Sequence, residues 1–422
     1  MRSGRFDIPE LTSAQREFLL VLRAAADGHA PAELPADWAT VLDLASLHQV
    51  ADFLYPSVQA WAPSCQPSAT LMTRWRASFL SAAARYTRAA VQARELLAAL
   101  HAAEVRVIPL KGVWLAERVY EDGSCRPMCD IDLLVPAEEL ARARAAVERL
   151  GYTTTDYYLR EECNKHAHYQ KPGTPLTLEL HWRLWLPDAE AVAEHDLTQM
   201  WTGLHEERLH GVPVLVFSPE RQLVYLTQHI LQHFLTVPLK AYLDLILMCR
   251  RYAPHFDLSR LEDEARVRRA TFGTKFVLQL AGDIWAVRPP ASLAAFLTSG
   301  GECEEERRAA LCAAVQLNKE SNRITPSLAT FNQASWICRI RIGLSCLVWA
   351  PWEIRQYYPQ GVRRFGLAGG YVWRCADLLR RHGRALRRGL GDGKGVDANL
   401  TNFATRQALA AWIHAQDAHE AN

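Results

Sequence analysis

Apolar residues recur at helical spacing through the first hundred residues of the chain. The segment AQREFLLVLRAAAD follows Leu11-Thr12-Ser13, which contains a candidate N-cap, and its apolar residues lie three or four positions apart. DWATVLDLASLHQVADFLYPSVQAW continues this pattern, and LMTRWRASFLSAAARYTRAAVQARELLAALHAAEV is a long Ala/Leu/Arg stretch of one or two helices. We therefore expect an N-terminal helical region over residues 1–103.

Short β-branched runs alternate with helices from about residue 104. VRVIPL (105–110) and CDIDLLV (129–135) have the composition of strands, and Pro136 stops the second. GVWLAERVYEDG between them predicts a helix, and AEELARARAAVERLGY predicts an amphipathic helix with Gly151 in the position of a C-cap. This alternation indicates a unit that contains both helices and strands.

Further strands are predicted downstream. They are TTTDYYLR, KHAHYQK and LTLELHWRLW (176–185), with the turn KPGTP before the last, and ERLHGVPVLVF adds a hairpin-like piece. The fold class we expect is α+β, with a small mixed-sheet core over residues 104–218 and helical regions on both sides of it in the sequence.

Helical periodicity returns after the predicted core. PERQLVYLTQHILQHF and LKAYLDLILMCRRY carry it, and we expect a helical domain over 219–350 that packs on the core. Residues 351–422 form a basic helical C-terminal region and tail. Its Arg-rich run from Arg363 is typical either of a site for nucleic acid or a phosphorylated partner, or of a solvated helix face. Sparse aromatic residues favour the solvated face.

Composition adds mainly exclusions. The chain has 422 residues, 49% of them hydrophobic and 22% charged, and a net charge of +2, so no global electrostatic bias indicates a nucleic-acid partner. The N-terminus lacks the apolar core of a secretory signal, and the apolar segment from Ile342 is too short to span a bilayer. The ten cysteines are scattered without metal-site spacing. We expect reduced thiols, a cytoplasmic protein and no membrane partner.

Two aspartates interrupt the apolar strand CDIDLLV. Because strand side chains alternate between faces, Asp130 and Asp132 share one face, while Ile131 and Leu133 point into the core. Two carboxylates about 7 Å apart along a strand repel each other. They are tolerable on an exposed strand, or they hold a divalent cation such as Mg²⁺ or Mn²⁺, which takes hard oxygen ligands.

The strand LTLELHWRLW offers a third carboxylate by the same alternation. Glu179 and His181 lie on one face, and the leucines with Trp182 lie on the other. If this strand neighbours the aspartate strand, Glu179 completes a three-carboxylate cluster that holds metal, and one carboxylate takes a proton from an acceptor hydroxyl. The alternative is a solvated glutamate. His181 either positions the acceptor or a carboxylate, or is a hydrogen-bonded neighbour of Trp182.

Basic residues lie upstream of the aspartates. Lys111-Gly112 stands at a strand-to-helix turn, where glycine lets the backbone approach a phosphate and lysine adds a positive charge. Arg126 is a second candidate for binding phosphate, or a structural ion pair.

Four further histidines have two interpretations each. His166 and His168 share a strand face and either border the pocket or lie on an exposed hairpin. His229 and His233, at i and i+4 on a helix, suit a metal, but no third ligand is evident and packing is favoured.

Taken in order, LKGVWLAERVY, RPMCDIDLLV, a helix ending in LGY, and LELHW resemble the uncharacterised nucleotidyltransferase family within the DNA polymerase β-like superfamily. YLTQHILQHF followed by LKAYLDLILM is similar to that family's helical segment after the catalytic sheet. The resemblance covers residues 100 to 250 with motifs.

The resemblance implies metal-dependent transfer of a nucleoside monophosphate from an NTP to an acceptor, with release of pyrophosphate. It implies Asp130 and Asp132 as metal ligands and Glu179 as the third carboxylate. Lys111-Gly112 replaces the superfamily's usual Gly-Ser, which leaves the mode of triphosphate binding open.

The resemblance leaves the acceptor open among a small molecule, a peptide and a protein. The alternative function is a non-catalytic nucleotide-binding or partner-binding protein with the same fold. A nucleic-acid-modifying transferase would depend on the Arg-rich C-terminus alone, and a nucleic-acid partner is not expected.

Overall fold

The computed structural model describes residues 10–154, 165–184, 199–298, 303–316, 354–355, 358–389 and 393–420. Contacts divide the chain into two units. The first comprises Met1–Leu317 and Leu409–Asn422, and the second comprises Asn318–Ala408. The first unit contains both sheets and the candidate site.

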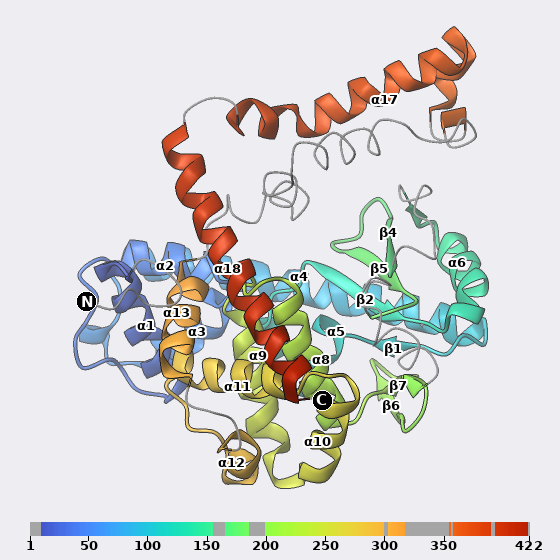
Figure 1. Ribbon diagram of the computed structural model, residues 1–422. Helices are drawn as coiled ribbons and strands as arrows, with labels where there is room; N and C mark the ends of the chain where they lie inside the picture. Colours follow the sequence, from blue (N-terminus) through green and yellow to red (C-terminus); the bar gives the residue numbers. More distant parts are fainter. Residues whose placement is uncertain are drawn as a thin grey trace. The chain divides into compact units, whose positions relative to one another are not determined.

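Four α-helices precede the first strand, as the apolar spacing predicts (Figure 1). Thr12 caps the first in a capping box with Gln15, which confirms the expected N-cap. The fourth is one continuous helix rather than two. The helices are α1 (Ser13–Ala26), α2 (Trp38–Leu47), α3 (Ala51–Ala60) and α4 (Ala69–Ala102).

A five-stranded mixed sheet follows, in the order β1-β2-β5-β4-β3. β2 and β5 pair in parallel at its centre, and the other neighbours pair antiparallel. The strands are β1 (Ile108–Pro109), β2 (Asp130–Leu134), β3 (Thr153–Thr154), β4 (His166–Gln170) and β5 (Thr177–His181). The mixed sheet expected from the sequence is confirmed. Most of the predicted strand TTTDYYLR, after Thr154, lies outside the described residues.

Two helices connect the first strands of this sheet. α5 (Gly112–Arg118) follows β1, and α6 (Leu140–Arg149) follows β2. Gly151 has φ +88°, a left-handed conformation that favours glycine and ends the chain's helical path there. α5 is shorter than the predicted segment, and two 3₁₀ turns, η2 (Gly123–Cys125) and η3 (Ala137–Glu139), complete the connections.

A two-stranded antiparallel hairpin forms a second sheet from β6 (His205–Leu209) and β7 (Val212–Val216). Its turn residues His210 and Gly211 both have positive φ, as a two-residue hairpin turn requires. The backbone N–H of Leu215 donates to the carbonyl of Val107, which attaches the hairpin beside β1.

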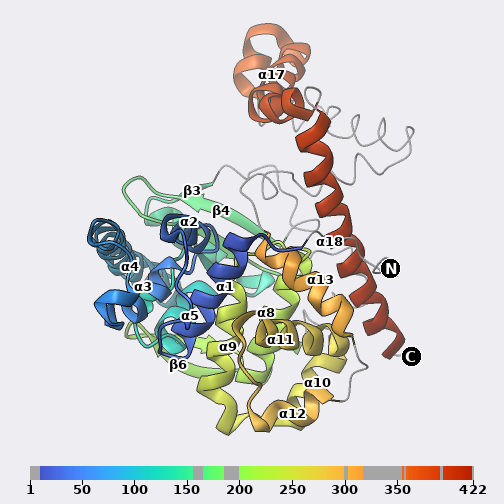
Figure 2. The ribbon, with the colours of Figure 1, turned by 90° about the vertical axis from the view of Figure 1, so that its left-hand side faces the viewer.

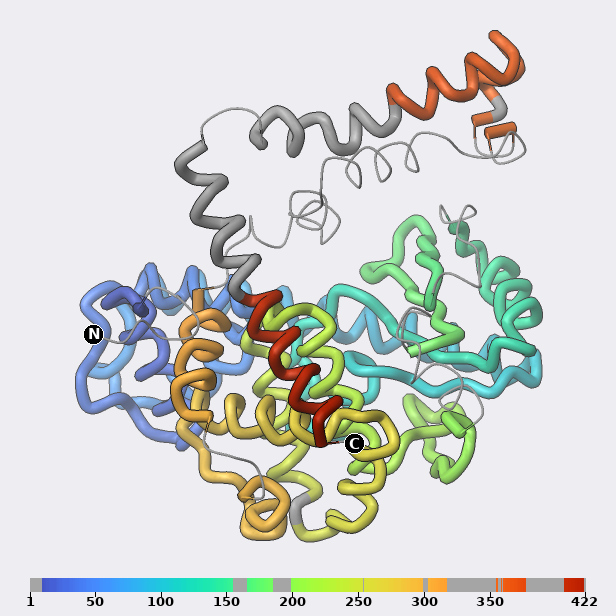
Figure 3. Tube along the Cα trace, viewed as in Figure 1, coloured from blue at the N-terminus to red at the C-terminus, as the bar shows by residue number. Residues whose placement is uncertain are grey.

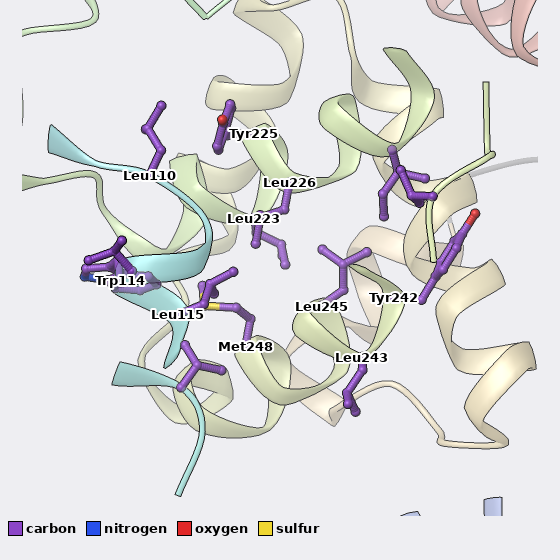
Figure 4. Packing of buried hydrophobic residues seen from close by; sticks show 14 of the residues in the cluster. Leu110, Trp114, Leu115, Leu223, Tyr225, Leu226, Tyr242, Leu243, Leu245 and Met248 are labelled. Carbon is purple, nitrogen blue, oxygen red and sulfur yellow. The ribbon is translucent and has the colours of Figure 1, made fainter. Parts of the chain in front are cut away.

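Helices after residue 218 enclose a core that α5 shares. Figure 2 shows α8, α9 and α11 beside one another, and their packing is direct. In Figure 4, buried side chains of α5 face those of α8 and α9. The residues labelled there include Leu110, Trp114, Leu115, Leu223, Leu226, Leu245 and Met248, all at most 5% exposed. This packing fixes the helix that begins at the candidate site.

The second half of the chain is helical throughout its described ranges after β7, apart from the connections between helices. Its helices are α8 (Pro219–Gln232), α9 (Lys240–Tyr252), η5 (Ala253–His255), α10 (Leu258–Val267), α11 (Thr271–Trp285), α12 (Ala291–Thr298), α13 (Glu304–Val315), α17 (Pro359–Gly389) and α18 (Gly393–Glu420).

The end of α18, which belongs to the first unit, packs close to α11 (Figure 3). Trp412 lies edge-on to Phe272 and Phe276, and the Asp417 carboxylate accepts from the backbone N–H of Gly273 at 3.1 Å. No helix within the described ranges is long and apolar enough to cross a membrane.

Candidate functional site

The two acidic strands predicted from the sequence are neighbours. β2 and β5 run in parallel, with Asp132 in register with Glu179 and Asp130 in register with Thr177. Ile131 is fully buried on the opposite face. The conditional expectation that Glu179 lies beside the aspartate strand is therefore confirmed, and the alternation of the two strands puts the three carboxylates on one face.

Asp132 is the most enclosed carboxylate, with its side chain 1% exposed. Its Oδ1 lies 3.2 Å from Lys111 Nζ and 3.0 Å from His181 Nε2. Burial alone would raise the pKa of Asp132, but the charge of Lys111 and the hydrogen bond from His181 outweigh it and hold the pKa below its usual range. Asp132 is thus an anion at neutral pH.

Asp130 differs from its neighbour two residues away. Burial, followed by the charges of Asp132 and Glu179, raises the pKa of Asp130 to about 6. Lys111 and Lys240 oppose this rise without cancelling it. Asp130 therefore carries the electrostatic cost of crowding three carboxylates, which a bound cation would relieve.

Lys111 reaches this cluster from a strained backbone position. Its φ of +43° and ψ of −112° are unusual for a residue with a side chain, and it forms the N-cap of α5. The N–H of Leu110 donates to the carbonyl of Asp132, which aligns this turn with β2. Burial lowers the pKa of Lys111, but Asp132 and the other carboxylates more than reverse that effect. Lys111 stays a cation.

Glu179 is surrounded by imidazoles. Its Oε1 lies 3.4 Å from Nε2 of His168, and its Oε2 lies 3.3 Å from Nε2 of His181 and 3.9 Å from that of His166. Burial would raise the pKa of Glu179, but hydrogen bonds from His168 and His181 hold it well below its usual range. Burial, with the neighbouring His181, lowers the pKa of His166 to about 4. His166 and His168 thus border the site, a point that the sequence left open.

Arg126 is engaged elsewhere. Its Nε and one Nη donate to the two carboxylate oxygens of Asp244 at 2.9 and 2.8 Å, and the Tyr120 hydroxyl also donates to Asp244. Of the two interpretations of Arg126, this geometry favours a structural ion pair over phosphate binding. The partner is Asp244 and not an aspartate of β2. A Cβ on Gly112 would meet Arg126 Nη1 at 3.0 Å and Met128 at 3.3 Å, so a larger residue there would have to displace these side chains by a few tenths of an ångström.

Three residues that the sequence did not single out also lie close to the carboxylates. Tyr225 on α8 is buried, which raises its pKa, and the charges of Lys111 and the carboxylates act on it. Burial, and to a smaller extent the charge of Lys111, lowers the pKa of Lys165. Burial, and to a smaller extent the charge of Arg126, lowers the pKa of Lys240 to about 8. Lys240 Nζ donates to the carbonyl of Pro127 at 2.9 Å. Lone residues on helices and loops carry no spacing signal, so only the fold identifies them.

His229 and His233 on the face of α8 lie near the same cations. Burial, followed by the charge of Lys111, lowers the pKa of both, to about 4 for His233. Their rings are 4.6 Å apart, centroid to centroid. The two imidazoles are therefore kept neutral beside Lys111.

The donor set fits a divalent cation and a phosphate group. Three carboxylates supply hard oxygen ligands for a cation. The lysines around them supply positive charge and N–H donors for phosphate oxygens. The raised pKa of Asp130 marks the place where positive charge is lacking.

Comparison with known proteins adds the following. The sequence model of a family described as "Uncharacterised nucleotidyltransferase" matches residues 35–286. Among curated proteins, none matches the chain. A solution structure of the antibiotic-resistance factor ANT(2'')-Ia is similar, with 20% identity, a TM-score of 0.32, and coverage of 44% of this chain and 91% of that chain. That likeness is too low to carry information on substrate.

Proposed function

The chain belongs to the uncharacterised nucleotidyltransferases, a family of transferase enzymes, and from this premise we propose that it moves an NMP from an NTP to a hydroxyl or similar acceptor. The acceptor class is a small molecule, a peptide or a protein. Mg²⁺ or Mn²⁺ is the metal that the resemblance implies, and the NTP is the co-substrate.

One observation supports this proposal: β2 and β5 run in parallel with Asp132 in register with Glu179, Asp130 lies on the same face of β2, and Lys111 Nζ is 3.2 Å from Asp132. A cluster of three carboxylates in a sheet is costly unless a cation binds there. Family membership supports nucleotide chemistry as the use of that cation.

Each group then has a part in the transfer. The acceptor oxygen attacks the α-phosphorus, the bond to the β-phosphate oxygen breaks, and pyrophosphate leaves. One carboxylate of the cluster takes the acceptor's proton. A cation held by Asp130, Asp132 and Glu179 would supply charge for the phosphate oxygens.

Lys111 and His181 act on this cluster directly. The Lys111 ammonium neutralises phosphate charge close to Asp132, and its strained backbone keeps it at that spot. His181 Nε2 orients Asp132 through its 3.0 Å hydrogen bond. Arg126 contributes through the packing of Gly112 and Asp244 rather than through direct phosphate contact.

The test uses the full chain with mixed NTPs, Mg²⁺ or Mn²⁺, and panels of hydroxylated small molecules and peptides. Mass spectrometry should detect an acceptor heavier by one NMP, together with pyrophosphate. The Asp130→Asn/Asp132→Asn variant should lose at least about a thousandfold in rate, roughly 4 kcal/mol. The matched control Glu206→Gln, an exposed acid on β6, should keep full rate.

A second measurement does not require the acceptor. Calorimetry with non-hydrolysable NTPs and Mg²⁺ should show binding that the double aspartate variant loses. Full activity in that variant, or no binding of any of the four nucleotides, would contradict the proposal.

A further inference from the structure

Two histidines and a glutamate converge beside the aspartate strand. His166 on β4 and His181 on β5 are register partners, and both point an Nε2 atom at Oε2 of Glu179. The distances are 3.9 Å from His166 and 3.3 Å from His181, and the three ligand atoms all lie within 4.8 Å of one another. They come from adjacent strands, so the pairing of β4 with β5 fixes the positions from which the three side chains leave the backbone.

The chemistry of this set differs from that of the three carboxylates. Mg²⁺ prefers oxygen ligands, whereas imidazole nitrogen suits borderline transition ions such as Zn²⁺, Cu²⁺, Fe²⁺ and Ni²⁺. Two imidazoles and one carboxylate, with a position left open, is also a ligand count used by catalytic zinc sites.

The geometry is close to what such an ion needs. Ligand atoms about 2.0–2.1 Å from a tetrahedral ion lie roughly 3.3 Å from one another. Glu179 and His181 already have that separation, at 3.3 Å. The widest pair needs to close by at most about 1.5 Å, which side-chain rotation supplies. Asp132 Oδ1, 3.0 Å from His181 Nε2, offers a fourth ligand atom.

Hydrogen bonding alone does not account for the cluster. The single Nε2 of His181 lies within 3.3 Å of carboxylates on two strands, and one N–H cannot be directed well at both. The Nδ1 atoms of His166 and His181 are buried and find no hydrogen-bond partner within the part of the chain that the structure describes. The side chains are sheltered, with His181 3% and His166 21% exposed.

We propose that His166, Glu179 and His181 form a metal centre that takes a borderline divalent ion of the Zn²⁺ or Co²⁺ class in preference to Mg²⁺. This centre deepens the proposed function, on which it rests for its catalytic use, because Glu179 belongs to both ligand sets. It makes nitrogen ligation, rather than carboxylates alone, the determinant of metal choice at this site.

The test measures metal binding by the full chain, stripped with a chelator and free of NTP. Calorimetry with ZnCl₂ and with MgCl₂ should show one tight Zn²⁺ site, at least about a hundredfold tighter than Mg²⁺. His166→Gln and His181→Gln should each weaken Zn²⁺ binding at least about tenfold. The control His205→Gln, on the exposed edge of β6, should bind as the unmodified chain does.

Bound Co²⁺ gives a second readout that does not depend on catalysis. The unmodified chain should show the intense visible absorption of four-coordinate Co²⁺, and Zn²⁺ should displace it. Circular dichroism of each variant checks folding, and the spectrum of the unmodified chain still decides if His181→Gln, at a buried position, does not fold. Equal affinity for Zn²⁺ and Mg²⁺ together with no such absorption would overturn the inference.

The two proposals fail separately. NMP transfer with Mg²⁺ and no selective Zn²⁺ binding would overturn the metal centre and leave the transferase standing. Selective Zn²⁺ binding with no nucleotide binding under any metal would support the centre and overturn the transferase.

Discussion

Two buried ion pairs in the first unit have opposite characters. Arg126 and Asp244 are 5% and 4% exposed, and two N–H groups meet two carboxylate oxygens at 2.8 and 2.9 Å. The Tyr120 hydroxyl donates to the same carboxylate. One positive charge faces one negative charge, and nothing more is needed to balance them.

The pair of Lys111 and Asp132 is longer, at 3.2 Å, and is not balanced. Asp130 and Glu179 act on the same space, so three carboxylates surround the Lys111 ammonium. Asp130 shows the imbalance as a pKa of about 6. A buried ion pair is therefore structural when its charges cancel, whereas surplus charge of one sign marks a place for a ligand.

The largest effect on activity should come from removing the excess negative charge at the three carboxylates. Asp130→Asn relieves the carboxylate repulsion and keeps the Lys111–Asp132 pair, so we expect unfolding free energy in urea that is unchanged or higher, with activity lower by at least about a thousandfold. Initial rates and urea titrations on the same preparation separate the two effects. A rate loss matched by unfolded protein would contradict this expectation.

The balanced pair should respond in the opposite way. Asp244→Ala leaves the Arg126 charge buried and unpaired, which we expect to destabilise the chain by about 3–5 kcal/mol in urea unfolding. Arg126→Met/Asp244→Leu, which removes both charges, should recover most of that loss. If the double variant is stable but its KM for NTP rises more than tenfold, Arg126 binds phosphate and the structural interpretation is wrong.

Asp417 is a third buried carboxylate, and the charge of Lys275 offsets its burial only in part. Burial raises its pKa to about 7, against an unfolded value of 3.8, so the native state holds the proton between these pH values and loses stability as the pH rises through them. Asp417→Asn lacks this titration. The unfolding free energy of the variant in urea, taken relative to that of the unmodified chain, should therefore rise by about 2–4 kcal/mol between pH 4 and pH 7.5. A constant difference across that range would show that the carboxylate is hydrated.

The smallest effect is expected at a pair that is only partly buried. Arg118 and Glu207 lie 2.9 Å apart, but their side chains are 32% and 31% exposed, so water already solvates them. Glu207→Gln should cost less than about 1 kcal/mol, and 1 M salt should reduce even that. A loss as large as that of Asp244→Ala would mean that burial is not what separates the pairs.

Much of the fold followed from local patterns. Helical spacing predicted α1 to α4, α6, α8 and α9, and alternation predicted β2, β4, β5 and the β6–β7 hairpin. Strand extent was predicted less well, since β5 ends at His181 and β1 has two residues, because pairing partners rather than propensity decide where a strand ends.

Strand alternation made one part of the candidate site predictable, namely which residues lie on the same face of a strand. Residues two apart on a strand share a face, so Asp130 with Asp132, and Glu179 with His181, could be grouped from the sequence alone. The roles assigned to these residues, and to Lys111 and Gly112, stay predictions that the variants above test. Lys165, Tyr225 and Lys240 could not be grouped with them, since no period connects separate elements.

Which side chains share a face follows from the order of residues alone, because two-residue and 3.6-residue periods are local properties of the backbone. Which faces meet depends on how the elements pack in three dimensions. The parallel pairing of β2 with β5 brings Asp132 beside Glu179, and β4 adds His166 across from His181. The same packing gives Arg126 a partner 118 residues away and leaves the carboxylates with Lys111. These choices depend on long-range burial, which decides the cost of each charge and which no spacing along the chain encodes.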